Sequence, residues 1–220
     1  MFHTISRRSL LKGTATGAAG LVAGFNPLIR ARADSLTIGI VYVGPRDDFG
    51  WNQAHAVAAQ ALRDLPDVTV VEEENVPETN AVSQSMESMI ELDGAGLIFA
   101  TSFGYYSPFM LDTAASYPDV QFRHAAGLWS DTDPSNAGSY YGYLDQAHYV
   151  DGVAAGLSTT SNKLGFVAAK PIGTVLLNIN SFTLGAKSVN PNATVQVIFT
   201  GEWSMPVREA EAANALIDAG

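Results

Sequence analysis

Four short stretches of the sequence carry aromatic, amide or acidic side chains directly after runs of residues typical of a β-strand. They are GPRDDFGWN (44–52), TSFGYYSP (101–108), AKPIGTVLLN (169–178) and TGEWSMP (200–206). Stacking on an aromatic ring contributes roughly 1–3 kcal/mol per base in nucleic-acid complexes, so such rings are a sensible source of affinity for a flat heterocycle. The chemistry that these residue types predict is recognition of a planar, polar small molecule.

We predict that the aromatic members of these stretches stack on the ligand and that the polar members hydrogen-bond its edges. The predicted ligand-binding residues are Asp48, Trp51, Asn52, Phe103, Tyr105, Asn178 and Trp203. Both tryptophans also have a structural alternative. Trp51 could staple onto the first turn of a following helix, and Trp203 could cover an apolar core.

Arrangements typical of enzymes are weak or missing in the sequence. The chain has no cysteine, which excludes a thiolate nucleophile, a disulfide and a Cys-ligated metal. Its histidines lack the spacing of metal sites, and neither a G-x-S-x-G elbow nor a Walker loop occurs. Asp47 and Asp48 are adjacent, so on an extended segment they point apart and make a poor acid–base pair. We therefore predict no catalytic residue, no metal and no cofactor, and structural roles for His55 and His148.

Alternating strand-like and helix-like runs must position the four stretches, and this rhythm is typical of βαβ units in an α/β fold with parallel sheets flanked by helices. The predicted strands are 36–43, 67–73, 95–100, 120–126, 139–144, 163–169 and 193–200. The predicted helices are 52–64, 80–92, 106–117, 145–158, 174–189 and 206–218. Thr79 is expected to cap one helix, and Pro206 to occupy the first turn of another. Because ligands bind beyond the carboxyl ends of parallel strands, all four stretches fall where a site is expected.

An internal repeat predicts two similar lobes. The segment that begins with LTIGIVYVG (36–44) is echoed by the one that begins with KLGFVAAKP (163–171), and both continue through helix, strand and helix. A general βαβ rhythm is the competing explanation. We predict lobe 1 over 34–144 and lobe 2 over 145–220, with a hinge near 143–145. The second copy stops after its second helix, so we expect lobe 2 to be incomplete at the C-terminus.

Residues 1–33 resemble an export signal, because they hold five basic residues, no acidic one, and a twin-arginine-like run, Ser6 to Lys12, before a Gly- and Ala-rich segment. We predict export by the twin-arginine machinery, cleavage after Ala33 and a free protein in the periplasm. The remaining seven basic and 22 acidic residues give a formal net charge of −15, which argues against nucleic acid as a partner. The acidic run Glu72–Glu74 is expected to be a solvated strand end.

Three segments resemble those of a known family. They are DDFGWN (47–52), YLDQAHYVDGVAAG (143–156) and GEWSMPVREAEAA (201–213). They are similar to segments of the basic-membrane-protein (Bmp) family of ABC-transporter substrate-binding proteins, the PnrA-like group. The resemblance runs from about residue 36 to 220 and implies a two-lobed type I periplasmic binding protein. The better known members of the family bind purine nucleosides.

The resemblance also implies roles for single residues. The family's stacking aromatic falls on Trp51, its neighbouring Asn on Asn52, and its second stacking ring on Trp203. Gly50 stands where the family has Ser, and both stacking rings are enlarged to Trp. These departures leave the identity of the ligand open.

Three functions remain as hypotheses. The first is an extracytoplasmic receptor that closes on a purine base or nucleoside and presents it to an ABC permease in the inner membrane. The second keeps the fold but takes a sugar, because sugar pockets also use Trp faces beside Asp and Asn. The third is a nucleoside-processing enzyme on a similar scaffold, since fold alone does not decide function.

Overall fold

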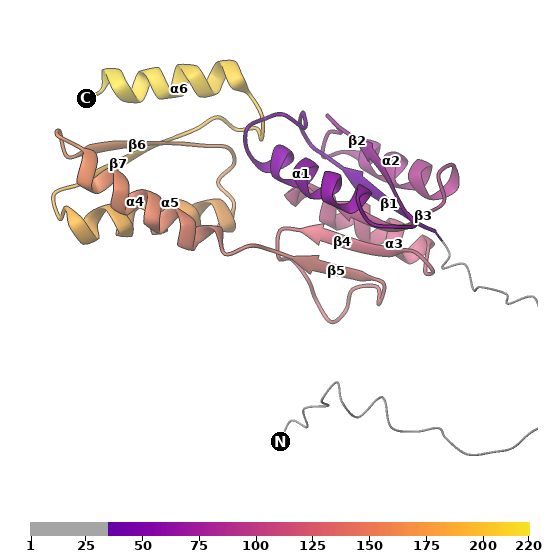
Figure 1. The fold of residues 1–220 in the computed structure, drawn as a ribbon. Helices are drawn as coiled ribbons and strands as arrows, with labels where there is room; N and C mark the ends of the chain where they lie inside the picture. Colours follow the sequence, from indigo (N-terminus) through magenta and orange to yellow (C-terminus); the bar gives the residue numbers. More distant parts are fainter. Residues whose placement is uncertain (1–34) are drawn as a thin grey trace, which may run out of the picture. The chain divides into compact units, whose positions relative to one another are not determined.

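The computed structural model describes residues 35–220, which contain two parallel sheets (Figure 1). The first has five strands in the order β2-β1-β3-β4-β5, and the second consists of β6 and β7. The strands are β1 (Leu36–Val41), β2 (Val68–Glu73), β3 (Ala95–Ala100), β4 (Gln121–Ala125), β5 (Ala137–Tyr140), β6 (Lys163–Ala168) and β7 (Thr194–Phe199). The helical segments are α1 (Trp51–Arg63), α2 (Asn80–Glu91), η2 (Phe103–Tyr105), η3 (Tyr106–Met110), α3 (Leu111–Ser116), α4 (Leu144–Ser158), α5 (Gly173–Val189) and α6 (Pro206–Asp218).

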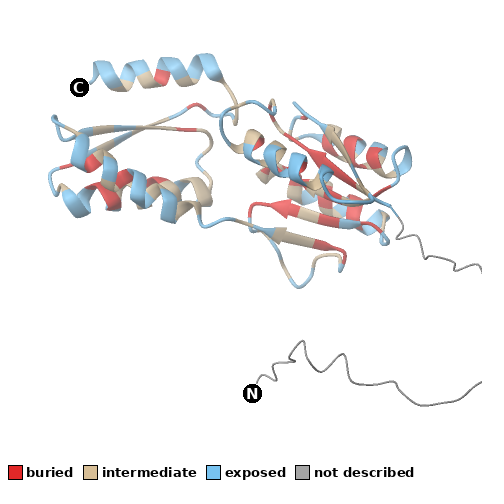
Figure 2. Ribbon diagram, in the orientation of Figure 1, coloured by how far each residue is buried: buried red, intermediate tan, exposed pale blue. Residues whose placement is uncertain are grey.

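The first sheet is buried on both faces, because successive side chains of a strand point to opposite sides. Ile38 and Ile40 of β1 pack with Ala59 of α1 on one face. Val41 packs with Met86 of α2 in the larger cluster on the other face. Figure 2 shows the buried residues along these strands and on the helix surfaces that cover them. The two cores hold the strands at fixed positions, so the loops at their carboxyl ends start from a rigid base.

The second sheet packs with α4 and α5, and these two helices are in close contact with each other at glycines. A Cβ atom added to Gly152 would lie 2.0 Å from the backbone oxygen of Phe182, and one added to Gly185 would lie 2.0 Å from that of Tyr149. Phe182 also meets Phe166 of β6 edge to face, with ring centroids 5.3 Å apart. Because these residues have no Cβ atom, the backbones of the two helices can contact each other directly.

Within residues 35–220, each predicted strand, and each predicted helix except the one at 106–117, occurs close to its expected position. The side chain of Thr79 accepts a hydrogen bond from the backbone N–H of Ala81, so the predicted cap of α2 is confirmed. Pro206 is the first residue of α6, as predicted. The strand expected at 139–144 is β5, which ends earlier, at Tyr140. The predicted α/β class with parallel sheets is thus confirmed.

The helix predicted at 106–117 is wrong in detail, because the structure divides this region into η2, η3 and α3. Ser107 has extended backbone angles (φ −125°, ψ 132°) inside η3. Pro108 follows it, and the residue before a proline is driven out of the helical region by a clash with the proline ring. Regular helix therefore starts only at Leu111.

The prediction of a solvated acidic strand end is wrong for Glu72, whose side chain is 4 % exposed. The hydroxyl of Tyr42 donates a hydrogen bond of 2.6 Å to Glu72, and Arg46 and Arg63 pair with the same carboxylate. The parallel pairing of β1 with β2 brings Tyr42 beside this strand end. The carboxylate of Glu72 is thus buried and paired with other side chains.

The predicted export signal and the cleavage after Ala33 lie outside the described residues. Among the helices of residues 35–220, none has the length and apolar character needed to cross a membrane.

Candidate functional site

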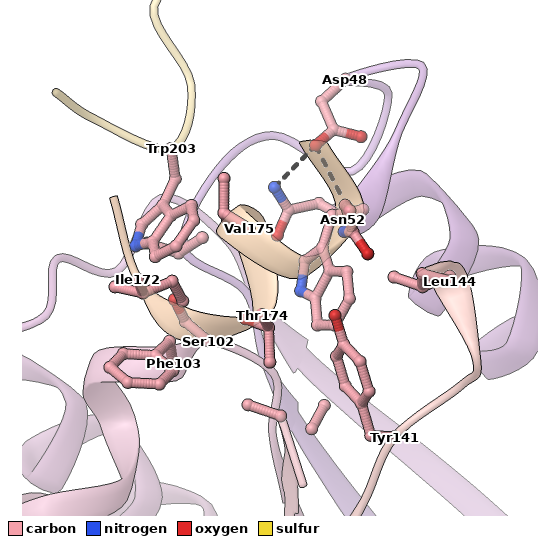
Figure 3. Close-up of a pocket in the computed structure, with 15 residues that line it drawn as sticks. Asp48, Asn52, Ser102, Phe103, Tyr141, Leu144, Ile172, Thr174, Val175 and Trp203 are labelled. Carbon is pink, nitrogen blue, oxygen red and sulfur yellow. Dashed lines mark hydrogen bonds between the residues drawn. The ribbon is translucent and has the colours of Figure 1, made fainter. Parts of the chain in front are cut away.

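A cavity of about 150 Å³ lies beyond the carboxyl ends of strands from both sheets (Figure 3). It is lined by Val43, Asp48, Trp51, Asn52, Ser102, Phe103, Ala125, Ala126, Tyr141, Leu144, Ile172, Thr174, Val175, Asn178 and Trp203. In Figure 3, Trp203 and Phe103 lie on one side of the cavity, and Tyr141 and Leu144 lie on the other. An apolar cavity of about 150 Å³ can hold a benzene-sized ring. The walls therefore suit a small aromatic or ring-shaped ligand.

Trp51 is the first residue of α1, and its ring is held from two directions. The indole N–H donates a hydrogen bond to the backbone oxygen of Thr101, just after β3. The ring also packs on His55, one helical turn later, with centroids 4.8 Å apart. Because its polar atom is bonded within the protein, the indole offers only its apolar surface to the cavity.

His55 supports this arrangement. Its Nδ1 lies 2.8 Å from the backbone oxygen of Trp51 and, as an N–H, donates to it. Burial lowers the pKa of His55, and the hydrogen bond to Trp51 offsets only part of that effect. His55 thus lies on a helix with a hydrogen bond and a ring contact to Trp51, which is consistent with the predicted structural role.

Trp203 lies in the loop that joins β7 to α6 and lines the cavity. Its indole N–H donates a hydrogen bond of 2.8 Å to Oε1 of Glu78, in the loop between β2 and α2. The ammonium group of Lys170 lies 5.3 Å from the centroid of the ring, within cation–π range. Two charged groups therefore hold this ring at the cavity.

Asp48 organises the N-terminus of α1 rather than facing the cavity with free oxygens. Its Oδ1 accepts from the backbone N–H groups of Gly50 and Gln53, both at 2.9 Å. Its Oδ2 accepts from the backbone and side-chain nitrogens of Asn52, at 3.1 and 2.8 Å. Burial alone would raise the pKa of Asp48, but these hydrogen bonds outweigh it and hold the pKa below its ordinary value of 3.8. The carboxylate thus caps α1 and orients Asn52.

Replacing Asp48 with alanine is expected to lower the free energy of unfolding by about 0.5–2 kcal/mol at neutral pH, as loss of a helix cap does. Since the folded pKa is depressed, the carboxylate stabilises the fold fully above pH 3.8 and loses this effect as the pH falls through the folded pKa. Urea unfolding of both proteins at pH 7 and near pH 3 measures the difference. Asp47→Ala, at an exposed neighbour, is the control. Equal losses for the two variants at pH 7 would contradict the capping role.

Two of the amide side chains that line the cavity have an oxygen without a hydrogen-bond partner within the described residues. These oxygens are Oδ1 of Asn52 and Oδ1 of Asn178, and both are buried. The Nδ2 group of Asn52 donates to Asp48, which leaves Oδ1 as the free acceptor of this side chain. A buried acceptor without a donor costs about 1–3 kcal/mol, so the site favours a ligand that brings N–H or O–H groups.

Comparison with known proteins then places the chain among ABC-transporter proteins. The family described as Bmp, ABC transporter substrate-binding protein PnrA-like, matches residues 35–220. The chain belongs to this family. It is 39 % identical over 204 residues, 90 % of the chain, to a purine-binding protein of Brucella abortus. It is also 37 % identical over 222 residues, 99 % of the chain, to a Haloferax volcanii protein named as a candidate ABC transporter glucose-binding protein.

This Bmp-family chain spans about half the length of these curated relatives, 56 % of the first and 54 % of the second. Among solved structures, a solute-binding protein of an ABC transporter from Aeropyrum pernix K1 superposes with a TM-score of 0.71 at 20 % identity. That match covers 84 % of this chain and 53 % of the other. A corresponding protein from Conexibacter woesei, at 24 % identity, gives 0.63 and covers 84 % of this chain and 61 % of the other. These structures show the fold of ABC solute-binding proteins.

The structure brings together six of the seven predicted site residues at the cavity, all except Tyr105. Tyr105 is fully buried in the core of the first sheet, and its hydroxyl donates to the backbone oxygen of Val76. The prediction that Tyr105 binds the ligand therefore does not fit this structure, in which the turn η2 places this ring in the core and Phe103 at the cavity. That the other six contact a ligand stays a prediction.

Sequence reasoning missed several residues of this Bmp-family site. Tyr141 is not among the predicted site residues, but it lines the cavity beside Trp51, with ring centroids 6.4 Å apart. Glu78 and Lys170 were not singled out, although both follow a parallel strand on the side where ligands bind. That position was the signal that could have found them.

Proposed function

We propose that the chain forms the ligand site of a receptor that binds a purine base or nucleoside and delivers it to an ABC permease. The observation that carries this proposal is that Asn52 and Asn178, which line the same cavity as Trp51 and Trp203, each have a buried oxygen without a hydrogen-bond partner. A purine offers flat faces for the rings and N–H groups for the oxygens. Both needs of the site are met by one planar ligand.

The relatives support the same ligand class. The Brucella abortus relative, which is 39 % identical to the chain, is named a purine-binding protein. Enlargement of both stacking rings to Trp, inferred from the family resemblance, keeps a flat surface on each side of the ligand. Binding without chemical change is part of the proposal, so the ligand is expected to be recovered unaltered.

The proposal also includes a route and a partner. The twin-arginine-like segment predicts export of the precursor, with a mature chain that begins at Asp34 in the periplasm. Lobes over 34–144 and 145–220 would close on the ligand through a hinge near 143–145. The closed form is expected to be the one that the permease in the inner membrane recognises.

A sugar receptor is the second candidate. The Haloferax volcanii relative, 37 % identical, is named for glucose binding. Sugar hydroxyl groups can also donate to the oxygens of Asn52 and Asn178, and the C–H face of a sugar ring can lie against a tryptophan. Both candidate ligands would use the same two oxygens and the same aromatic surfaces.

Calorimetric titration of the full-length protein separates them. The purine set is adenine, guanine, hypoxanthine, xanthine and their nucleosides, and the sugar set is glucose and ribose. We expect saturable heat from at least one purine. Neither sugar is expected to displace the bound purine. Binding of glucose with no response to any purine would reject the purine proposal in favour of the second candidate. Conversion of a nucleoside to base and ribose would reject binding without turnover.

A further inference from the structure

A charged network lies directly behind the Trp203 side of the cavity, and none of the predicted ligand contacts explains it. At its centre is Glu78. Its Oε1 accepts hydrogen bonds from the indole N–H of Trp203 at 2.8 Å, and from Ser102 Oγ and the backbone N–H of Gly104, both at 2.7 Å. One carboxylate oxygen thus touches the loop after β3 and the loop after β7.

Lys170 completes the network from the loop between β6 and α5. Its ammonium nitrogen lies 3.0 Å from Oε2 of Glu78 and 3.0 Å from Oε2 of Glu202. The same ammonium lies over the ring of Trp203. One cation therefore joins Glu78, which follows the first sheet's β2, to Glu202, which follows the second sheet's β7. It also lies within cation–π range of the ring that Glu78 binds.

The burial of these groups distinguishes Glu78 from an ordinary surface partner. The side chain of Glu78 is 16 % exposed and that of Lys170 is 26 % exposed, whereas that of Glu202 is 60 % exposed. Exposed ion pairs contribute little, but hydrogen bonds to a charged, partly buried group are among the stronger ones. The contacts of Glu78 are therefore the part of the network that we expect to fix the positions of the side chains.

The charge state of both groups fits this role. Burial alone would raise the pKa of Glu78, but hydrogen bonds from Ser102, Lys170 and others outweigh it and keep the pKa below its usual value. Burial alone would lower the pKa of Lys170, but its hydrogen bonds to Glu78 and Glu202 raise it instead. At neutral pH the carboxylate and the ammonium are both charged.

We propose that Glu78 is a positioning residue that orients the indole of Trp203 at the ligand cavity. Through Lys170, the same carboxylate also links the loops that follow the two sheets. The effect on affinity rests on the proposed ligand-binding function, but the orientation of the ring does not. An indole N–H has one hydrogen to donate, so a fixed acceptor sets the direction of the N–H bond, and the Lys170 ammonium over the ring constrains the ring face. Ligand binding then meets a ring that is already in place, which lowers the entropic cost of binding.

The first test measures the ring without any ligand. Hydrogen exchange of indole N–H groups is followed in ¹H–¹⁵N spectra of the full-length protein, with the Trp203 signal assigned by its loss in Trp203→Phe. We expect Glu78→Ala to speed exchange at Trp203 by about tenfold or more, because a hydrogen bond to a charged group is lost. Glu78→Gln keeps an oxygen acceptor and is expected to give an intermediate rate. Trp51, bonded to Thr101, is the internal control and should exchange at an unchanged rate in a folded variant.

Glu87→Ala is the matched control variant. Glu87 lies on α2, and its side chain forms no hydrogen bond or ion pair with any of residues 35–220. We expect it to leave the exchange of Trp203 unchanged. An unchanged rate at Trp203 in Glu78→Ala, with Trp51 still protected, would overturn the proposal.

The second test asks whether Glu78 acts on affinity through Trp203. The dissociation constant of the tightest purine is measured for the wild type, Glu78→Ala, Trp203→Phe and the double variant. We expect Glu78→Ala to weaken binding by about tenfold when Trp203 is present. In the Trp203→Phe background, where no indole N–H remains, the same change is expected to have less than about a twofold effect. Equal effects in both backgrounds would overturn the positioning role.

The two proposals fail in different ways. If the wild type binds no purine, the purine proposal is rejected, and the exchange rate at Trp203 still decides the role of Glu78. If the wild type binds a purine but neither affinity nor exchange responds to Glu78→Ala, the positioning role is rejected and the purine proposal stands. A lowered thermal midpoint with unchanged exchange would mean that Glu78 has only a general stabilising role, which also rejects the inference.

Discussion

Replacing Trp203 with alanine is expected to weaken purine binding by roughly 1–3 kcal/mol, or about fivefold to 150-fold. The ring lines the cavity, and its polar atom is bonded to Glu78, so the ligand loses a stacking surface. Trp51→Ala should weaken binding by a similar amount. It should also lower stability, because the hydrogen bond to Thr101 and the packing on His55 are lost. Calorimetric titration of each variant measures the change in affinity.

Trp129→Ala is the control for this prediction. Trp129 is 63 % exposed and does not line the cavity. The substitution removes the same kind of ring from a position outside the cavity, and we expect affinity to stay within about twofold of the wild type. Affinity unchanged in both Trp51→Ala and Trp203→Ala would mean that the ligand does not lie against these rings.

Replacing Gly185 with alanine is expected to destabilise the packing of α4 against α5 strongly, by about 3 kcal/mol or more. The added Cβ would lie 2.0 Å from the backbone oxygen of Tyr149 and 3.1 Å from the backbone nitrogen of Val153. Backbone atoms cannot rotate out of the way as a side chain can, so α4 and α5 must move apart. Urea or thermal unfolding measures the loss.

Gly173→Ala provides the matched control on the same helix. Gly173 is the first residue of α5, and a Cβ added there meets nothing within 4 Å. Alanine favours the helix over glycine by about 0.5–1 kcal/mol, so this variant is expected to be as stable as the wild type or slightly more stable. If Gly185→Ala were as stable as Gly173→Ala, the close contact between α4 and α5 would be contradicted.

Most of the fold could be predicted because its signals are local. β-Branched runs bounded by Gly and Pro mark the strands, and Thr79 and Pro206 mark helix starts that the structure confirms. The position of the site could also be predicted, since parallel strands place their carboxyl ends together. Trp51 and Trp203 meet the same cavity for this reason, although 152 positions separate them in the sequence.

The rest depends on side-chain direction and on contacts between distant segments. Phe103 and Tyr105 lie two positions apart, and only the turn geometry decides that the first reaches the cavity and the second enters the core. The pairing of Glu78 with Lys170 joins residues 92 positions apart, so no local pattern contains it. Glu72 illustrates the same limit, because an acidic run looks solvated until its cationic and tyrosine partners are placed.

The account depends most on the ligand lying between the two tryptophans, and a crystal structure of the full-length protein with a bound purine tests this directly. We predict the purine ring stacked between Trp51 and Trp203, with an N–H group donating to Oδ1 of Asn52. A purine bound elsewhere, or a cavity in which the two indoles turn away from the ligand, would contradict the account.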